Sequence, residues 1–318
     1  MIKFLKTIGE DNNLSSSCEL VNLDSFESGC WIHMANPSED EINQVCATLN
    51  LENEFIKPAL DEEERPRIES ENGNTLILVD IPIVEIDGNR NIYSTIPLGV
   101  VLTRDCIVTV CLKDNPIVND FINKRMKSFF TQYKSRFLLQ LLFKNATFYL
   151  YYLRHIERIS NKIENDLQRS MKNKELTQLL KLEKSLVYFS TSLKSNEVVL
   201  EKLMKLEAIK KYPEDTELLE DVIIENRQAI EMTNIYSSIL SGMMDAFASI
   251  ISNNLNIVMK SLTIITIAIS IPTAISSFFG MNVPNMLENN PMALPIIIGG
   301  SIIASALATF LLIRRKQY

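Results

Sequence analysis

Polar residues recur along one C-terminal segment at alternating steps of four and three positions. This series, the polar seam, comprises Asp245, Ser249, Ser252, Asn256, Met259, Thr263, Thr266, Ser270, Thr273 and Ser277, all of them polar except Met259. A repeat of about 3.5 residues keeps such positions on one face of a helix. Neutral hydroxyl and amide oxygens suit a hard cation that keeps its water shell, as Mg²⁺ does, whereas Zn²⁺ favours His and Cys. The spacing therefore predicts the wall of a path for hydrated cations.

A structural role for the same hydroxyls stays open at this point. Ser and Thr side chains in helices can bond back to their own backbone or let helices pack closely. Asp245 and Asn256 lie in the same register as the hydroxyls and favour a pore. One chain has too few spans to enclose a channel, so a pore predicts a cyclic homo-oligomer.

Two long uncharged segments predict membrane spans. Ser261–Phe279 and Met292–Ile313 are 19 and 22 residues long, enough to cross a hydrocarbon core of about 30 Å. The alternative is a pair of buried helices in a large soluble protein. Both segments lie near the C-terminal end, so neither is expected to be a signal peptide.

Charge around these segments predicts their orientation. Lys260 precedes the first span, and Arg314, Arg315 and Lys316 follow the second, whereas the connecting loop 282–291 has Glu288 as its one charged residue. The positive-inside tendency then places both termini in the cytoplasm and the loop outside the cell membrane. The net charge of −7 argues against a nucleic-acid partner and is compatible with binding cations.

The remaining chemical groups do not predict an enzyme or an organic cofactor. Five cysteines show no CxxC spacing, and the isolated His33 and His155 cannot complete a zinc site. An odd number of cysteines in a mostly charged N-terminal part is typical of a reducing compartment. The chain also has no glycine-rich phosphate loop.

The organisation along the chain follows from composition and periodicity. Residues 1–135 predict a mixed α/β domain, with a helix capped by Ser38 and Glu41 and strands at 74–86, 98–103 and 106–111. A helical pattern returns over 115–130. Residues 136–260 predict a helical stalk. It begins with an antiparallel pair turning near 170–175 and interrupted at Pro213. A helix over 217–279, about 95 Å long if continuous, would then enter the membrane.

The C-terminal end divides into four expected segments. They are a first transmembrane helix at 261–281, an external loop at 282–291, a second transmembrane helix at 292–313 and a basic cytoplasmic tail at 314–318.

The stretch "NNLNIVMKSLTIITIAISIPTAISSFFGMN" (253–282) resembles the pore helix of the CorA family of divalent-cation transporters. That family's signature is Gly-Met-Asn closing the first of two C-terminal spans, which here is Gly280, Met281 and Asn282. Phe279 precedes it, where Tyr is commoner. The similarity extends more weakly upstream through "LLEDVIIENRQAIE" and "DEEERPRIE", so it covers most of the chain.

The resemblance implies a homopentameric funnel with a cytoplasmic αβα domain that transports hydrated Mg²⁺, and also Co²⁺ or Ni²⁺. It implies that Asn282 is the selectivity residue and that Gly280 and Met281 shape the turn. Pore-lining positions carried over from the family are Asn256, Met259, Leu262 and Thr273, with Asp245 in an acidic ring at the cytoplasmic mouth. Ser270 stands where some members have a Met constriction.

The resemblance also implies a regulatory metal site between copies of the chain. Asp221 matches one acid of that site, and its partner would lie near Asp87 of the neighbouring copy, so that cytoplasmic Mg²⁺ holds the pore closed. Without the resemblance, Asp221 would be a solvated helix acid and Asp87 a turn residue. Glu288 retains an acid in an external loop that otherwise departs from the family's Met-Pro-Glu-Leu pattern.

Two alternatives differ from a magnesium channel. One is a Zn²⁺ transporter of the same architecture. The other is a non-conducting membrane-anchored metal sensor or scaffold, for which a charge placed at Thr266 or Thr273 would leave function unchanged.

Overall fold

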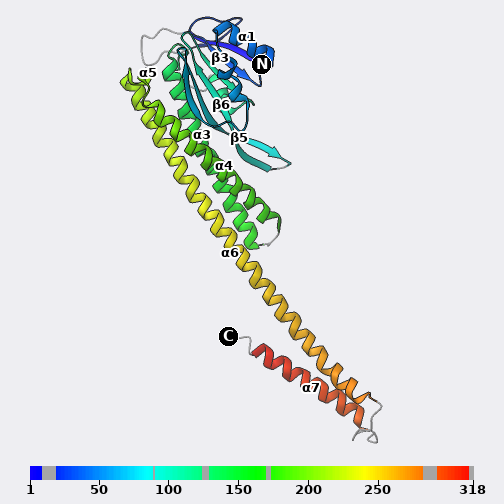
Figure 1. Cartoon of the computed structure of the whole chain (residues 1–318). Helices are drawn as coiled ribbons and strands as arrows, with labels where there is room; N and C mark the ends of the chain where they lie inside the picture. The colour runs from blue at the N-terminus through cyan, green and yellow to red at the C-terminus, as the bar shows by residue number, and fades with distance from the viewer. Residues whose placement is uncertain (9–18, 89, 124–128, 170–172, 282–291, 315–318) are drawn as a thin grey trace. The chain divides into compact units, whose positions relative to one another are not determined.

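The computed structural model describes residues 1–8, 19–88, 90–123, 129–169, 173–281 and 292–314 (Figure 1). The chain divides into two compact units, Met1–Met244 and Asp245–Tyr318. Asn282 and Glu288, two residues of the expected ion entrance, lie outside the described residues.

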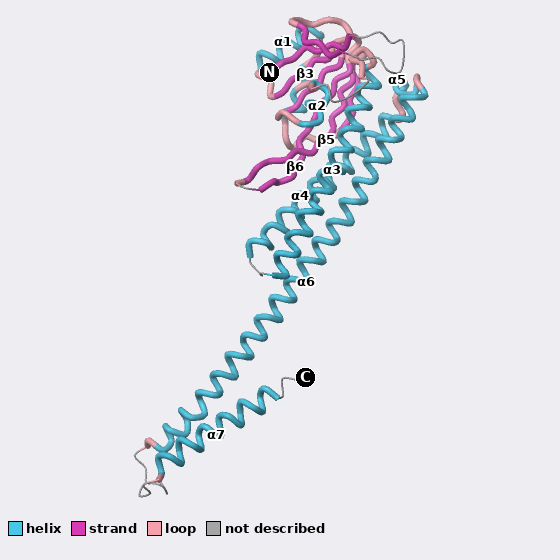
Figure 2. The backbone as a smooth tube through the Cα atoms, turned by 180° about the vertical axis from the view of Figure 1, so that it is seen from behind, coloured by secondary structure: helices cyan, strands magenta, loops and turns pink. Residues whose placement is uncertain are grey.

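The first unit contains a seven-stranded sheet, drawn in magenta in Figure 2. Its order is β2-β1-β3-β7-β6-β5-β4, and all neighbours are antiparallel except β3 and β7. The strands are β1 (Ile2–Ile8), β2 (Glu19–Leu23), β3 (Trp31–Ala35), β4 (Arg67–Glu71), β5 (Asn74–Asp87), β6 (Arg90–Leu102) and β7 (Ile107–Cys111). β5 and β6 are the longest of these strands, and their far ends project past the others as a hairpin (Figure 2).

Helices cover both faces of this sheet. The short helices α1 (Glu39–Leu49), η1 (Asn53–Phe55) and η2 (Lys57–Leu60) pack over a core that includes Ile32, Met34 and Val108. On the other face lie α2 (Pro116–Ile122), α3 (Lys134–Arg169), α4 (Asn173–Leu203), α5 (Glu207–Lys210) and the first part of α6 (Pro213–Phe279). Trp31 and Phe137 pack edge to face within this second core. The arrangement confirms the expected αβα layers and the long antiparallel helices.

Several element boundaries differ from the expected ones. The capping box is confirmed, because Ser38 N donates to Glu41 Oε2 at 2.9 Å and Glu41 N donates to Ser38 Oγ at 3.3 Å. β6 begins at Arg90, because it pairs with the whole length of β5. α2 ends at Ile122, so the helix expected over 115–130 is wrong at 129–130. α6 begins at Pro213, one turn earlier than expected, since proline is pre-organised for a first helical turn.

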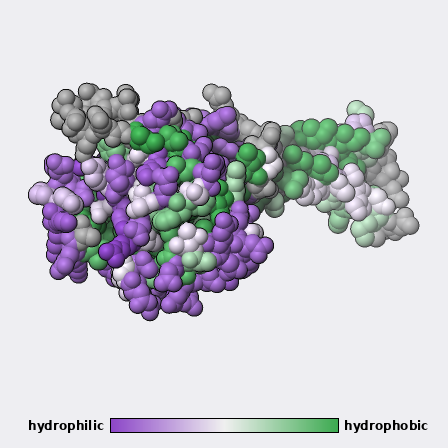
Figure 3. All heavy atoms as spheres, turned by 90° about the horizontal axis from the view of Figure 1, so that it is seen from above, coloured by the Kyte–Doolittle hydropathy of each residue, from purple (hydrophilic) through white to green (hydrophobic). Residues whose placement is uncertain are grey.

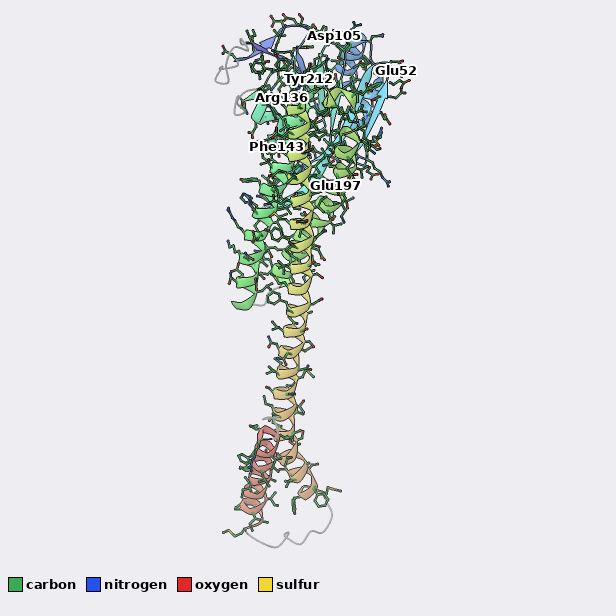
Figure 4. The ribbon with its side chains drawn as sticks, turned by 90° about the vertical axis from the view of Figure 1, so that its left-hand side faces the viewer. Glu52, Asp105, Arg136, Phe143, Glu197 and Tyr212 are labelled. Atoms are coloured by element: carbon green, nitrogen blue, oxygen red, sulfur yellow. The ribbon has the colours of Figure 1, made fainter. Side chains whose placement is uncertain are left out.

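Salt bridges attach the start of α6 to the two helices beside it. Arg136 of α3 donates to Glu214 at 2.8 Å, and Arg227 of α6 donates to Glu197 of α4 at 2.8 Å (Figure 4). These groups are largely exposed, so each pair contributes little to stability by itself. The apolar residues Leu219, Val222 and Ile223 of α6 are buried in the helix-side core. Burial therefore does more than charge to hold α6 here.

Asn196 of α4 supplies a partner for a part of β5 that no strand covers. β4 pairs with β5 only as far as Leu78, so the backbone of Asp80 has no strand neighbour on that side. Asn196 donates from Nδ2 to Asp80 O at 2.8 Å and accepts from Asp80 N at 2.9 Å. Asn145 and Tyr149 of α3 also donate to Asp80 O. Side chains thus complete the edge and fix α3 and α4 on the sheet.

Cys30 and Cys106 are neighbours in space although they lie far apart in the sequence. They directly precede Trp31 and Ile107, which pair in register on β3 and β7, and both thiols are buried on the α1 side. A hydrogen bond from Cys106 lowers the pKa of Cys30 to about 7, and the same contact raises the pKa of Cys106. The four cysteines that the structure describes are free thiols.

His33 is a buried histidine of β3. Its Nδ1 lies 2.9 Å from Thr109 Oγ1, which also accepts from Trp31 Nε1 at 2.8 Å. Burial, and with it the positive charge of Lys3, lowers the pKa of His33 from 6.5 to about 4. The imidazole is therefore neutral at physiological pH and has a structural role.

We expect the first unit to lose stability as the pH falls from about 6.5 to 4. The unfolded chain binds a proton at His33 more readily than the folded chain, so acid favours unfolding. Lowering this pKa from 6.5 to about 4 corresponds to about 3 kcal/mol of the free energy of unfolding, all of it lost below pH about 4. Urea unfolding followed by the fluorescence of Trp31, the one tryptophan of the chain, measures it. His33→Gln should flatten the dependence, and a parallel pH profile in that variant would contradict this role.

The second unit is a helical hairpin made of the end of α6 and α7 (Ala293–Arg314). α6 continues without a break through Pro272, as expected. The apolar stretches of the two helices are long enough to cross a membrane, and 0% and 6% of them are buried within the chain. In Figure 3 this unit presents mainly hydrophobic side chains, unlike the hydrophilic surface of the first unit. Such exposure is wrong for the core helices of a soluble protein and fits membrane spans.

Candidate functional site

All ten members of the polar seam are exposed on α6. They lie within the second unit, from Asp245 at its start to Ser277 near the end of the helix. Leu262, which the family resemblance adds to the pore lining, is 55% exposed, and Met259 is 52% exposed. The expected seam is therefore available to contact water or further copies of the chain.

α7 packs on the side of α6 that faces away from the polar seam. The partly buried residues of α6 in this region are Ile264, Ile267, Ala268, Ile271, Pro272, Ile275 and Phe279. At about 100° per residue their mean direction lies roughly 140° from that of the seam. Small residues of α7, including Ser301 and Ala304, occupy the facing side. The second span thus covers the apolar face of α6 and leaves the polar face open.

Four hydroxyls of the seam bond back to their own helix. Ser249 donates to Asp245 O at 3.0 Å and Thr263 to Met259 O at 2.8 Å. Thr266 donates to Leu262 O at 2.9 Å, and Thr273 donates to Ile269 O at 2.8 Å. The structural role left open by the sequence is therefore present in the molecule.

Back-bonding also decides what the seam can bind. Each of these hydroxyls has used its single proton, so its oxygen presents only lone pairs to the exposed side. A water molecule held on a cation points its hydrogens outward and needs acceptors around it. The seam consequently suits a hydrated cation and disfavours an anion.

The end of α6 is set by Gly280. Its N–H donates to Ser276 O at 3.0 Å, and a Cβ at Gly280 would lie 3.2 Å from the same oxygen. A larger residue would therefore crowd the carbonyl that closes the helix. Met281 follows and is 56% exposed. Asn282, the third residue of the Gly-Met-Asn motif, lies just outside the described part of the chain.

The two expected regulatory acids lie in the first unit. Asp221 is exposed on α6, where Glu217, Glu220 and Glu231 are exposed as well. Asp87 ends β5, paired in the backbone with Arg90 at the tip of the hairpin, and its side chain is outside the described set. Among the residues that the structure describes, no group of three or more His, Cys, Asp or Glu could hold a metal ion.

One residue of interest was not predicted from the sequence. Ser305 of α7 donates from Oγ to Ala268 O of α6 at 2.7 Å. The sequence does place a serine in one apolar span and a proline in the other. Their relation becomes visible only when it is known which faces of the two helices meet.

An αβα unit, a long helix with a polar face and two apolar C-terminal spans together are typical of a two-span membrane transport protein. The model of the CorA-like Mg²⁺ transporter protein family matches residues 26–315. The chain therefore belongs to the CorA-like Mg²⁺ transporter family, as its Gly-Met-Asn region suggested. Its members are transporters rather than enzymes.

Individual relatives agree with this assignment. The cobalt/magnesium transport protein CorA of Methanocaldococcus jannaschii is 28% identical over 279 residues, which cover 84% of this chain and 86% of that protein. The complete structure of the CorA magnesium transporter from M. jannaschii matches with a TM-score of 0.80 and 24% identity, covering 99% of this chain and 98% of that one.

A second solved structure shares the fold at lower similarity. The full-length CmaX protein matches with a TM-score of 0.69 and 16% identity, covering 100% of this chain and 97% of its own. At these identities the structural matches bear on the fold, which they confirm through both units.

Proposed function

We propose that this protein conducts hydrated Mg²⁺, and also Co²⁺ or Ni²⁺, across the cytoplasmic membrane through a central pore lined by the polar seam. The observation that supports this most is the position of the seam, which is exposed along α6 on the side opposite α7. In a single lipid-facing helix such a face would be unfavourable. Around a shared axis it becomes the wall of an aqueous path.

The chemistry of the wall favours Mg²⁺ that keeps its water. Mg²⁺ dehydrates reluctantly and usually retains several water ligands in protein sites. The back-bonded hydroxyls of Thr263, Thr266 and Thr273 accept hydrogen bonds from those waters. Met259 and Leu262 add a narrow apolar ring. At the external end Asn282 offers a neutral amide oxygen, which holds the hydrated ion weakly enough to release it.

The pore requires several copies of the chain, and the family resemblance favours a homopentamer. Every residue from Ala248 to Thr263 is exposed, and the exposed set includes Leu255 and Val258, each 62% exposed. Large apolar side chains exposed together in this way need protein or lipid around them. Neighbouring copies of α6 cover these residues in the cytoplasmic part, and the bilayer covers the outer faces of 261–281 and 292–313.

The proposed topology has both termini in the cytoplasm. Residues 1–135 and 136–260 form the cytoplasmic domain and stalk, loop 282–291 faces outward with Glu288 at the entrance, and 314–318 is the basic tail. Lys260 and Arg314 mark the cytoplasmic ends of the two spans. The membrane potential then drives uptake, at about 2.3 kcal/mol per charge per 100 mV.

Closure by cytoplasmic Mg²⁺ completes the proposal. Asp221 belongs to an exposed acidic face of α6, and Asp87 lies on the projecting β5–β6 hairpin. In the oligomer, Asp87 of one copy meets Asp221 of the next. Mg²⁺ bound between them removes their mutual repulsion and holds the ring closed, and loss of the ion loosens it.

Ion competition in liposomes tests the transport function. Purified protein in vesicles with an inside-negative potential should admit Mg²⁺, with Co²⁺ and Ni²⁺ competing. Added Mg²⁺ on the cytoplasmic side should slow the flux, and Asp221→Asn should weaken this inhibition. Flux of Zn²⁺ in preference to Mg²⁺ would replace the proposal with a zinc transporter. No flux of any of these dications would favour the non-conducting sensor or scaffold.

A further inference from the structure

Pro272 leaves a carbonyl without its helical partner in the middle of the apolar part of α6. Proline has no backbone N–H, so the carbonyl four residues earlier, that of Ala268, loses its intrahelical hydrogen bond. Unpaired backbone groups are costly in an apolar environment, because no water is available there to replace the lost bond. The chain must therefore satisfy Ala268 O in another way or bend at this point.

Ser305 supplies the missing donor from the other helix. Its Oγ lies 2.7 Å from Ala268 O and donates the hydroxyl proton. The neighbouring carbonyl, that of Ile269, also receives a hydroxyl, from Thr273 of α6 at 2.8 Å. The carbonyls of Ala268 and Ile269 thus accept hydrogen bonds from two hydroxyls, the first from α7 and the second from within α6.

The position of Ala268 around α6 leaves few alternatives to the Ser305 hydroxyl as a hydrogen-bond donor. Ala268 belongs to the partly buried face of α6 that packs against α7. At about 100° per residue it lies roughly 170° from the mean direction of the polar seam. Water in a path along the seam cannot reach this carbonyl. Thr273, by contrast, is on the seam and already bonds to a different carbonyl.

We infer that Ser305 is a positioning residue for the pore helix, and that its hydrogen bond to Ala268 O fixes the direction of α6 beyond Pro272. The segment it directs contains the outer part of the seam, Thr273 and Ser277, and ends at Gly280. A change in its direction would move these groups relative to the axis. The expected effect on transport rests on the proposed function. The hydrogen bond and its coupling to Pro272 do not.

A double-mutant cycle between Ser305→Ala and Pro272→Ala isolates this interaction. In the protein that retains Pro272, Ser305→Ala should lower the unfolding midpoint of the full-length chain in detergent micelles. It should also lower the maximal Mg²⁺ flux about tenfold, the change that 1.4 kcal/mol produces, while the half-saturating Mg²⁺ concentration stays the same. Pro272→Ala restores the backbone N–H that bonds Ala268 O. In that background Ser305→Ala should have little further effect on either quantity.

Two further variants control the cycle. Ser305→Thr keeps the hydroxyl and should retain most of the flux. Ser301→Ala removes a buried hydroxyl of α7 that donates within its own helix, to Ile298 O at 2.8 Å. It should show no coupling to Pro272→Ala.

Measuring both stability and flux separates the positioning role of Ser305 from the proposed transport function. Equal losses from Ser305→Ala in the proline and alanine backgrounds would overturn the positioning role. Coupling in the unfolding midpoint together with no Mg²⁺ flux from the unmodified protein would refute the proposed transport and leave the hydrogen bond in place. Coupling in stability with unchanged flux in Ser305→Ala would overturn the positioning role for transport.

Discussion

Replacing Asn282 with alanine should abolish Mg²⁺ uptake while the oligomer still assembles. Asn282 follows the last turn of α6, where Gly280 closes the helix on Ser276 O. In the proposed pore, a ring of its amide oxygens accepts hydrogen bonds from the waters of the arriving ion. Alanine has no such oxygen, so the ion would lose its entrance site. In the proposed oligomer, assembly depends on the apolar and acidic faces of α6, which this change does not touch.

Uptake into liposomes measured with a Mg²⁺-sensitive dye checks this expectation, and light scattering of the purified protein checks assembly. Asn285→Ala is a matched control, because it removes the same side chain from the same loop outside the Gly-Met-Asn motif. It should conduct. Asn282→Asp introduces a carboxylate, which binds the dication more tightly and should slow its release. Normal flux from Asn282→Ala would remove the basis for assigning this residue.

A lysine at Thr266 should reduce Mg²⁺ flux at least about a hundredfold. Thr266 lies in the seam, and the copies of the chain would place a ring of positive charges around the path. A dication 6 Å from one such charge is disfavoured by about 1.4 kcal/mol even at the dielectric constant of water. The energies of several such charges in a narrow path add, so the barrier is higher still. The non-conducting scaffold predicts that the substitution leaves function unchanged.

Ser261→Lys provides a matched control for Thr266→Lys. Ser261 is exposed on the same helix and donates to Ile257 O at 2.9 Å, as the threonines of the seam do to their own carbonyls. It lies roughly 180° from the mean direction of the seam at about 100° per residue. It also directly follows Lys260, so in the proposed topology an added lysine can reach the cytoplasmic water. Flux should persist. Equal loss from both variants would mean that the seam does not face the path.

The expectations that survived best depended on repeating local patterns. The capping box at Ser38 and Glu41, the strand at 74–86 and the continuous helix through Pro272 each follow from residues close together in the chain. The strands β1, β2 and β4 were not predicted: β2 and β4 have five residues each, and β1 contains two lysines. Pairing of β1 with β2 and β3, and of β4 with β5, stabilises them. The helix expected over 115–130 was wrong at 129–130, where Phe129 is buried without being helical, because helical spacing does not by itself specify helical structure.

The tertiary structure added contacts between residues that are distant in sequence. Asn196 forms hydrogen bonds with the backbone of Asp80, because β4 ends before it reaches this part of β5. Cys30 and Cys106 meet because β3 and β7 run parallel in register, although their sequence spacing suggested no relation. These contacts depend on the packing of whole elements, and the type of each residue does not specify its partner.

By itself the sequence indicated a two-span membrane protein with a polar face on its long helix, and the Gly-Met-Asn region added the resemblance to the CorA family. Hydropathy, charge flanks, helical periodicity and a short motif are properties of consecutive residues, so they can be recognised without coordinates. The tertiary structure alone decided that α7 covers the face opposite that seam, that back-bonding leaves the seam hydroxyls as acceptors, and that Ser305 bonds the carbonyl freed by Pro272. Each depends on the rotation of one helix against another, which local sequence does not encode.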